Sequence, residues 1–90
     1  ILDFNRDHVA DKYTRLNTAM GVAESSDPAD FIRELNAKLG LPANLSEMGV
    51  QSNAIADLAA HAAKDVCTFT NPRPCSASEY ETLFEIALGA

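Results

Sequence analysis

The spacing of apolar residues constrains the fold of this chain more than any other feature of its sequence. Apolar side chains recur three and four residues apart in successive segments, which glycine, proline and serine residues separate. No segment alternates apolar and polar residues in the way that a half-buried strand does. The sequence therefore predicts an all-α fold, a small bundle of about four helices with one additional short helical turn.

Residues that start and stop helices locate these elements along the chain. Serine, aspartate and an N-terminal proline favour helix starts, whereas glycine and an internal proline favour helix ends. The helices are predicted over Ala10–Met20, Pro28–Leu39, Ser52–Lys64 and Ala77–Leu88, and the short turn over Leu45–Met48. Together they would form a single domain or subdomain over residues 1–90.

Caps and apolar stripes within these segments give more specific predictions. Asp27, Ser52 and Ser76 are expected to cap their helices, and Ser76 and Glu79 have the spacing of a capping box. Each helix also has an apolar stripe that we expect to be buried. The stripe residues are Val9, Tyr13, Leu16 and Met20; Phe31, Ile32, Leu35 and Leu39; Ile55, Leu58, Ala59 and Ala62; and Tyr80, Leu83, Phe84, Ala87 and Leu88.

Charge and composition exclude several kinds of partner. The 90 residues include 13 acidic and 7 basic side chains, which gives a net charge of −6. An acidic surface repels nucleic acid and anionic lipid, so neither is expected as a partner. No apolar run reaches the roughly 18 residues that span a membrane, and the first residues lack the pattern of a signal peptide. We therefore expect a cytoplasmic protein, with Cys67 and Cys75 as reduced thiols.

A few polar side chains are weak candidates for chemistry. Asp57 and His61 lie one helical turn apart and could share a metal ion, but a metal centre needs further ligands, which favours a solvated pair. Cys67 has no nearby histidine to activate it, so a buried or pocket-facing thiol is favoured over a nucleophile. His8 is expected at the surface. No nucleotide-binding or hydrolase motif occurs, so we predict no catalytic, cofactor-binding or metal-binding residue.

The segment Asp65–Cys75 differs from the helical scaffold around it. It is polar, rich in proline and longer than most connections between packed helices, which is typical of a functional loop. Arg73 lies between two prolines, which restrict its backbone. We expect Asn71 and Arg73 to anchor this loop, with Arg73 paired to a carboxylate or a helix C-terminus rather than to an anionic ligand. The sequence indicates no role for Phe69 or Cys75.

Several short motifs follow one another along the chain. They are Leu2-Asp3-Phe4-Asn5, Lys12-Tyr13, Met20-Gly21, Leu39-Gly40-Leu41-Pro42, Leu45-Ser46-Glu47-Met48-Gly49-Val50, and Asp65-Val66-Cys67-Thr68 with Thr70-Asn71-Pro72-Arg73-Pro74. In this ordered set the chain resembles the C-terminal segment of the iron-containing (group III, metal-dependent) alcohol dehydrogenases, whose helical C-terminal domain is of the dehydroquinate-synthase-like type.

The resemblance implies a function for the protein to which this segment belongs. Enzymes of the family interconvert alcohols with aldehydes or ketones, using NAD(P) bound by an N-terminal α/β domain and a divalent metal, iron or alternatively zinc. Both sites precede the matching segment, so Asp57 and His61 are not expected to be metal ligands. The chain would contribute scaffold and a loop in which Cys67 forms part of the substrate-pocket wall.

The resemblance, together with the start at Ile1, also leads us to expect a fragment that binds no cofactor and has no activity alone. Its partners would be the remainder of its own polypeptide and a small alcohol or aldehyde, and a homo-oligomer is an open alternative. Within the family, a maleylacetate reductase or a lactaldehyde or glycerol dehydrogenase is an alternative function. Outside the family, the alternative is an independent helical module that binds a partner protein.

Overall fold

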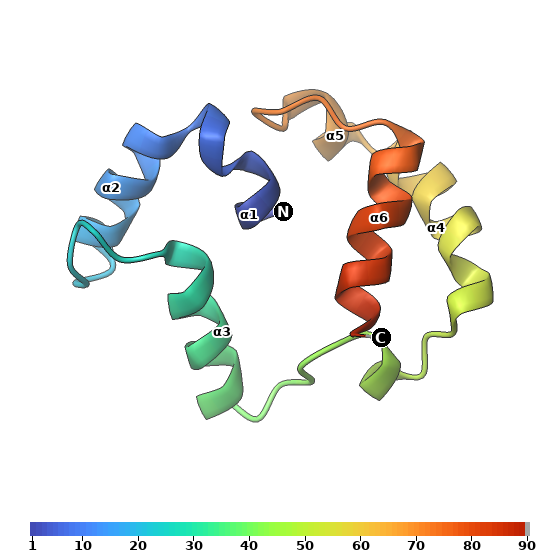
Figure 1. The fold of residues 1–90 in the computed structure, drawn as a ribbon, viewed down its shortest axis with the longest axis horizontal. Coiled ribbons are helices and arrows are strands. Elements are labelled where there is room, and N and C mark those ends of the chain that lie inside the picture. Colours follow the sequence, from blue (N-terminus) through green and yellow to red (C-terminus); the bar gives the residue numbers. More distant parts are fainter. Residues whose placement is uncertain (90) are drawn as a thin grey trace. The chain divides into compact units, whose positions relative to one another are not determined.

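The computed structural model describes residues 1–89, and every regular element in this range is a helix or a helical turn. Figure 1 shows the helices α1 (Leu2–Asn5), α2 (Ala10–Ala19), α3 (Pro28–Lys38), α4 (Ile55–Ala62), α5 (Val66–Thr70) and α6 (Ala77–Leu88). Short 3-10 turns are η1 (Arg6–His8), η2 (Ser46–Met48) and η3 (Ser52–Ala54). The predicted all-α class is therefore confirmed. Internal contacts divide the chain into two compact units, Ile1–Leu41 and Pro42–Ala90.

The predicted helices are present, with differences at their ends. Helix α6 spans the predicted residues, and α2 and α3 each end one residue early. The third predicted helix is two elements, because η3 precedes α4 and α4 ends at Ala62. The predicted Ser52 cap is wrong, since the turn starts after an extended Gln51 and no side chain caps it. Helices α1 and α5 were not predicted, because elements of 4 and 5 residues are too short to show periodicity.

In the first unit, a buried asparagine joins helix α2 to the turn that precedes α3. Asn17 is only 1% exposed, and its amide nitrogen donates to the backbone oxygens of Glu24 (3.1 Å) and Ser26 (2.6 Å). Asp27 then starts α3, since its carboxylate accepts a hydrogen bond from the amide of Ala29, as predicted. The geometry of this turn is therefore set by polar contacts.

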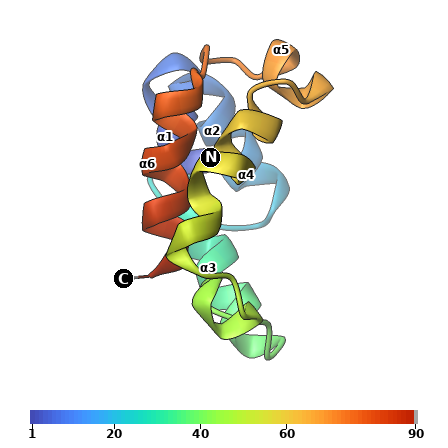
Figure 2. The same ribbon diagram turned by 90° about the vertical axis from the view of Figure 1, so that its right-hand side faces the viewer.

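In the second unit, helix α4 lies along helix α6 (Figure 2). Ala59 on α4 is fully buried, and Ile55 and Leu88 are also buried. The predicted capping box is confirmed at the start of α6, where Ser76 and Glu79 each accept the other's backbone amide hydrogen. A small side chain allows two helices to approach closely, which agrees with a fully buried Ala59 on the helix that contacts α6.

The end of α6 is capped by the segment before α4. The amide of Leu45 donates to the carbonyl of Ala87 at 2.9 Å, and the Ser46 hydroxyl donates to the carbonyl of Leu88 at 2.6 Å. These carbonyls belong to the last turn of the helix, where no amide of the helix itself can reach them. The predicted short turn is thus η2, and it closes α6.

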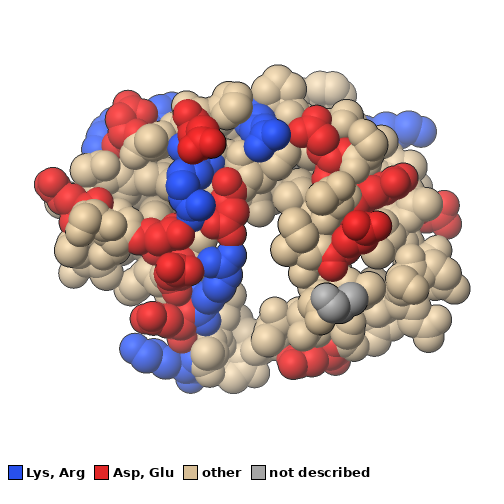
Figure 3. Space-filling view, viewed as in Figure 1, with Lys and Arg blue, Asp and Glu red and all other residues tan. Residues whose placement is uncertain are grey.

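Charged side chains form a network in the first unit. Arg6 donates to Asp3 (2.6 Å) and to Asp27 (2.5 Å), while Arg33 pairs with Asp3 and with Asp30. Figure 3 shows acidic and basic side chains interleaved over this unit, whereas acidic side chains lie over α6 in the second unit. Charge pairing therefore links α1, η1 and α3 within the first unit.

The apolar stripes are buried only in part. Val9, Ile55, Ala59 and Leu88 are buried as predicted. The prediction is wrong for four residues that the structure leaves exposed, namely Leu16, Leu35, Leu39 and Ala87. Periodicity identifies the apolar side of a helix, but burial also needs a second element on that side. Among residues 1–89, no helix combines the length and apolar composition of a membrane span.

Candidate functional site

The segment expected to be a loop contains the short helix α5. Asp65 has an extended backbone, and its carboxylate accepts the amide hydrogen of Cys67 at 2.8 Å, which caps the new helix. The helix ends at Asn71, which is again extended, as expected for a residue before proline. The prediction of a non-helical segment over Asp65–Cys75 is therefore wrong for Val66–Thr70, because a local cap outweighs the weak helix propensity of this stretch.

The side chain of Thr68 fastens α5 to its neighbours. Its hydroxyl donates to the carbonyl of Ala62 at the end of α4, with 2.6 Å between the oxygens. The same oxygen lies 2.5 Å from the phenol oxygen of Tyr80 on α6. A threonine hydroxyl has a single hydrogen, so Tyr80 is the donor in the second bond. The result is a continuous hydrogen-bond chain from Tyr80 through Thr68 to Ala62.

The inward direction of Thr68 determines where the other side chains of α5 point. Successive residues of an α-helix are rotated by about 100°. Cys67 and Phe69 therefore lie on opposite flanks of the helix, on either side of Thr68. Val66 shares a flank with Phe69, and their side chains are 72% and 76% exposed. The structure thus separates the thiol from the apolar pair.

The two cysteines have different surroundings. Cys67 is exposed, which corrects the expectation of a buried thiol at this position and leaves the pocket-facing alternative open. The hydrogen bond and the charge of Asp65 raise the pKa of the Cys67 thiol, so the thiol stays protonated near neutral pH. Cys75 is buried, and burial raises the pKa of its thiol too, with the charge of Glu79 adding to the effect. Neither environment activates a nucleophile.

The residues expected to anchor the segment make local contacts. The side-chain amide nitrogen of Asn71 donates to the backbone oxygen of Arg73, with 2.7 Å between the two atoms. The guanidinium of Arg73 lies 3.5 Å from a carboxylate oxygen of Glu79 on α6. The Asn71 bond thus lies within the proline-rich stretch, and the Arg73 contact joins this stretch to the start of α6. Their role in the complete protein stays a prediction.

The weak candidates for metal binding lie on the surface. Asp57, His61 and His8 are all exposed. Within residues 1–89, no three histidine, cysteine, aspartate or glutamate side chains come close enough to hold a metal ion together. A divalent metal needs at least that many ligands in a stable protein site. The described residues therefore do not fit a metal centre.

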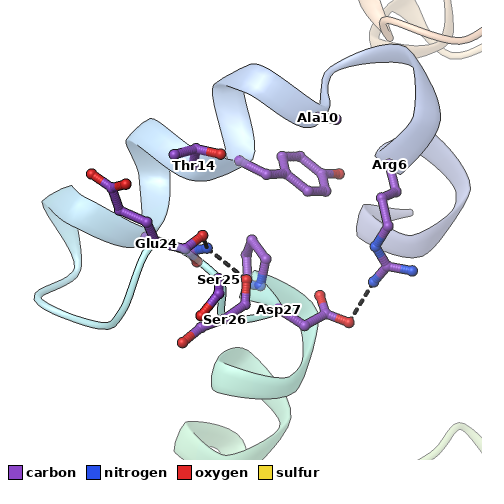
Figure 4. A pocket seen from close by; sticks show the side chains of 10 residues that line it. Arg6, Ala10, Thr14, Glu24, Ser25, Ser26 and Asp27 are labelled. Atoms are coloured by element: carbon purple, nitrogen blue, oxygen red, sulfur yellow. Dashed lines mark hydrogen bonds and ion pairs between the residues drawn. The ribbon is translucent and has the colours of Figure 1, made fainter.

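A cavity of about 270 Å³ that is open to solvent lies in the first unit, between α2 and the turn before α3. Its lining residues include Thr14, Glu24, Ser25, Ser26 and Asp27, with Arg6 at one side paired to Asp27 (Figure 4). Asn17 also lines it, and among the described residues the side-chain oxygen of Asn17 has no hydrogen-bond partner.

This cavity was not predicted from the sequence. The available signal was the position of Asn17, four residues after Tyr13 on the expected buried side of α2. A polar residue at such a position is buried only if it has partners, and it obtains them here from the next turn. Its lining includes the hydroxyls of Thr14, Ser25 and Ser26 but no histidine, lysine or cysteine beside them, and the hydrogen bonds of Asn17 there hold the turn before α3.

Comparisons with known proteins agree with one another. Residues 1–88 match the C-terminal part of the Fe-containing alcohol dehydrogenase family. The chain is 35% identical to 4-hydroxybutyrate dehydrogenase of Cupriavidus necator over 89 residues, which cover 94% of this chain and 23% of that protein. It is 30% identical to lactaldehyde reductase of Escherichia coli K12 over 95 residues, covering 97% and 25% of the two chains.

A further relative is the NAD-dependent methanol dehydrogenase of Bacillus methanolicus, 30% identical over 82 residues, which cover 90% of this chain and 22% of that one. The chain thus spans about a quarter of the length of these curated relatives. No solved structure gives a significant match.

Proposed function

Because the chain belongs to the Fe-containing alcohol dehydrogenase family, as its C-terminal helical part, we propose that it forms part of an enzyme that interconverts alcohols and carbonyl compounds with a nicotinamide cofactor. The observation that carries this proposal is the family match over residues 1–88. One relative is named as NAD-dependent and another as NADPH-dependent, so either cofactor is compatible with the family.

The contribution proposed for this chain is scaffold and pocket wall. Its described residues do not fit a metal centre, and its sequence has no dinucleotide-binding motif. We propose that the iron and the cofactor are held by other parts of a longer polypeptide. Large apolar side chains such as Leu39, Val66, Phe69 and Ile86 are more than 60% exposed here, and such surface usually packs against other protein.

Cys67 is the residue proposed to contact the substrate. It is exposed on α5, and its thiol is neutral because a hydrogen bond to the Asp65 carboxylate and the charge of that group raise its pKa. A neutral thiol of medium size contributes shape and dispersion to a pocket and does not add charge. The proposed role of Cys67 is therefore to limit the size of the alcohol or aldehyde that fits.

The substrate class proposed is a small alcohol or aldehyde. The relatives are named for 4-hydroxybutyrate, lactaldehyde and methanol, which are all compounds of a few carbon atoms. A pocket distinguishes neighbouring members of such a series by about 1–3 kcal/mol per methylene group. These three compounds are therefore the substrates to test first.

The test uses the full-length protein that contains this chain, loaded with iron and assayed with NAD and NADP on that panel and on straight-chain primary alcohols. Cys67→Leu adds volume to the proposed wall, so kcat/KM for the longest accepted alcohol should fall about 10-fold or more. Methanol should be affected least. Val66→Leu is the matched control, because it adds a methylene to the other flank of α5.

Two outcomes would overturn the proposal at different levels. Absence of alcohol or aldehyde turnover by the iron-loaded full-length protein with either cofactor would overturn the dehydrogenase function. An unchanged substrate range in Cys67→Leu would remove Cys67 from the pocket wall and leave the reaction class intact.

A further inference from the structure

Helix α5 depends on its attachments for its orientation. A helix of 5 residues is far shorter than the roughly 12 residues that an isolated helix needs in water. Its exposed side chains Val66, Cys67 and Phe69 make few contacts that could hold it. The rotation of α5 about its own axis is therefore set by the Asp65 cap and by the inward hydrogen bonds of Thr68.

We propose that Thr68 and Tyr80 are positioning residues for substrate selection, holding α5 in the rotation that presents the Cys67 flank to the pocket instead of the Val66–Phe69 flank. This inference rests on the proposed function of Cys67. It adds two residues that do not themselves contact the substrate and that act through the helix between them.

The position of the hydrogen-bond chain in the second unit allows it to fix the rotation of α5. It joins the end of α4 to α6 through α5, and α4 and α6 are the helices that pack most closely in this unit. Thr68 and Tyr80 are half-buried, so water competes less for their hydroxyls than for exposed ones. Both bonds are short, at 2.6 and 2.5 Å between oxygens. A rotation of α5 would break them.

The consequence of such a rotation would be large, because the two flanks differ in size. Cys67 presents a compact thiol, whereas Phe69 presents an aromatic ring, and the two lie about 200° apart around the helix axis. A partial rotation would withdraw the thiol from the pocket or replace it with bulkier side chains. Loss of the Thr68 bonds should therefore change which alcohols fit while leaving the reacting groups in place.

The experiment removes the hydroxyl groups one at a time in the full-length, iron-loaded enzyme. Tyr80→Phe deletes the bond to Thr68, Thr68→Val deletes both bonds, and Thr68→Ser keeps the hydroxyl as the conservative variant. Thr82→Val is the matched control. The Thr82 hydroxyl donates to a backbone carbonyl, that of Ser78, but Thr82 is exposed and takes no part in the hydrogen-bond chain. Thermal unfolding of each variant confirms that it is folded.

The kinetic readout is the ratio of kcat/KM between the shortest and the longest accepted alcohols. In Tyr80→Phe and Thr68→Val this ratio should move about fivefold or more, through KM, while kcat for the preferred alcohol changes by less than about twofold. Thr68→Ser and Thr82→Val should match the parent enzyme. A loss that affects all alcohols equally would overturn the inference, because it would indicate a merely structural role.

A second readout tests the position of α5 without reference to catalysis. Asp65 raises the pKa of the Cys67 thiol through the capped start of α5. Once α5 is released, the fraction of thiolate should rise, and iodoacetamide should modify Cys67 several-fold faster at pH 8, as followed by mass spectrometry. Cys75 is buried and serves as the internal reference in the Thr68 variants, but not in Tyr80→Phe, because the Tyr80 hydroxyl also bonds the Cys75 thiol.

The two readouts separate failure of this inference from failure of the proposed function. Unchanged Cys67 modification rates in both Tyr80→Phe and Thr68→Val would overturn the positioning role whatever the kinetics show. Faster modification with an unchanged alcohol ratio would also overturn it, because α5 would then move without affecting selection. If Cys67→Leu leaves the substrate range unchanged as well, the proposed pocket wall is what has failed.

Discussion

Within residues 1–89, the unit Ile1–Leu41 contains four ion pairs among Asp3, Arg6, Asp27, Asp30 and Arg33, whereas the unit after it has a pair between Arg73 and Glu79. The second unit instead has a close helix pair with a fully buried alanine. Exposed ion pairs contribute little free energy and are weakened by salt, whereas buried apolar contacts carry no charge that salt can screen or that a change of pH can titrate.

This difference bears on where a site can be built. A side chain that selects among similar substrates has to be held in place to a fraction of an ångström. The segment with Cys67 belongs to the second unit, where packing and helix caps define the geometry. The first unit buries Val9 and Ala29 but also relies on solvent-exposed charges and on the buried side chains of Asn5 and Asn17, so its geometry should respond to solution conditions.

The largest effect is expected from overpacking the helix pair. Ala59→Leu places a larger side chain where Ala59 is 0% exposed, and it should lower the free energy of unfolding by about 3 kcal/mol. Hydrogen exchange with peptide-level mass spectrometry should show faster exchange in α4 and α6. Ala60→Leu, at the exposed neighbouring position, is the control and should be close to neutral. Equal effects of the two variants would mean that α4 and α6 do not pack as described.

An intermediate effect is expected from the buried amide of the first unit. Asn17→Ala removes the donor for the carbonyls of Glu24 and Ser26, which should cost about 2 kcal/mol. Backbone hydrogen exchange should become faster in the turn before α3 and should stay the same in α4 and α6. Thr18→Ala, next to it but exposed, should have a much smaller effect. If exchange quickened throughout the chain instead, the expectation that the effect is confined to the unit containing Asn17 would be contradicted.

The smallest effect is expected from the charge network. Burial raises the pKa of the Asp3 carboxyl, but hydrogen bonds and charge attraction from Arg33 and Arg6 outweigh it, so the pKa lies below its ordinary value of 3.8. A pKa lowered by folding contributes stability that is complete above that value and is lost as pH falls through the folded-state pKa. Acid should therefore loosen the first unit before the second.

Asp3→Asn tests this expectation. Exchange in α1 and α3 should be slightly faster than in the parent at pH 7, and should change less between pH 5 and pH 3. About 0.5 M sodium chloride should reproduce part of the effect in the parent chain. Asp7→Asn, an exposed carboxylate outside the network, should leave the acid response unchanged. A parent chain whose two units loosen together in acid would show that the network does not set the difference.

Most of the fold could be predicted because its signals are local. Asp27, Ser76 and Glu79 act within one turn of their own helix, and their caps are present as predicted. The family also followed from short motifs in a fixed order, and the match over residues 1–88 confirms it. The Ser52 cap failed because the preceding backbone allowed a 3-10 turn to start without a side-chain bond.

The site was predicted less completely because its decisive contacts join residues of different elements, 6 to 12 positions apart, beyond the reach of one helical turn. Nothing near Thr68 in the sequence indicates that its hydroxyl meets Ala62 and Tyr80. The exposure of Cys67 and the pairing of Arg73 with Glu79 likewise follow from the position of α5 and α6. Roles of Cys67, Asn71 and Arg73 in a complete enzyme stay predictions.

The sequence by itself determined the helical class, most helix limits and the family, because helix periodicity, capping and short motifs depend on residues within a few positions of one another. Only the tertiary structure decided which apolar stripes are buried, that Asn17 closes a turn, and that Thr68 turns Cys67 outward. Those outcomes depend on which second element lies opposite a side chain, and that information is not contained in any local stretch of sequence.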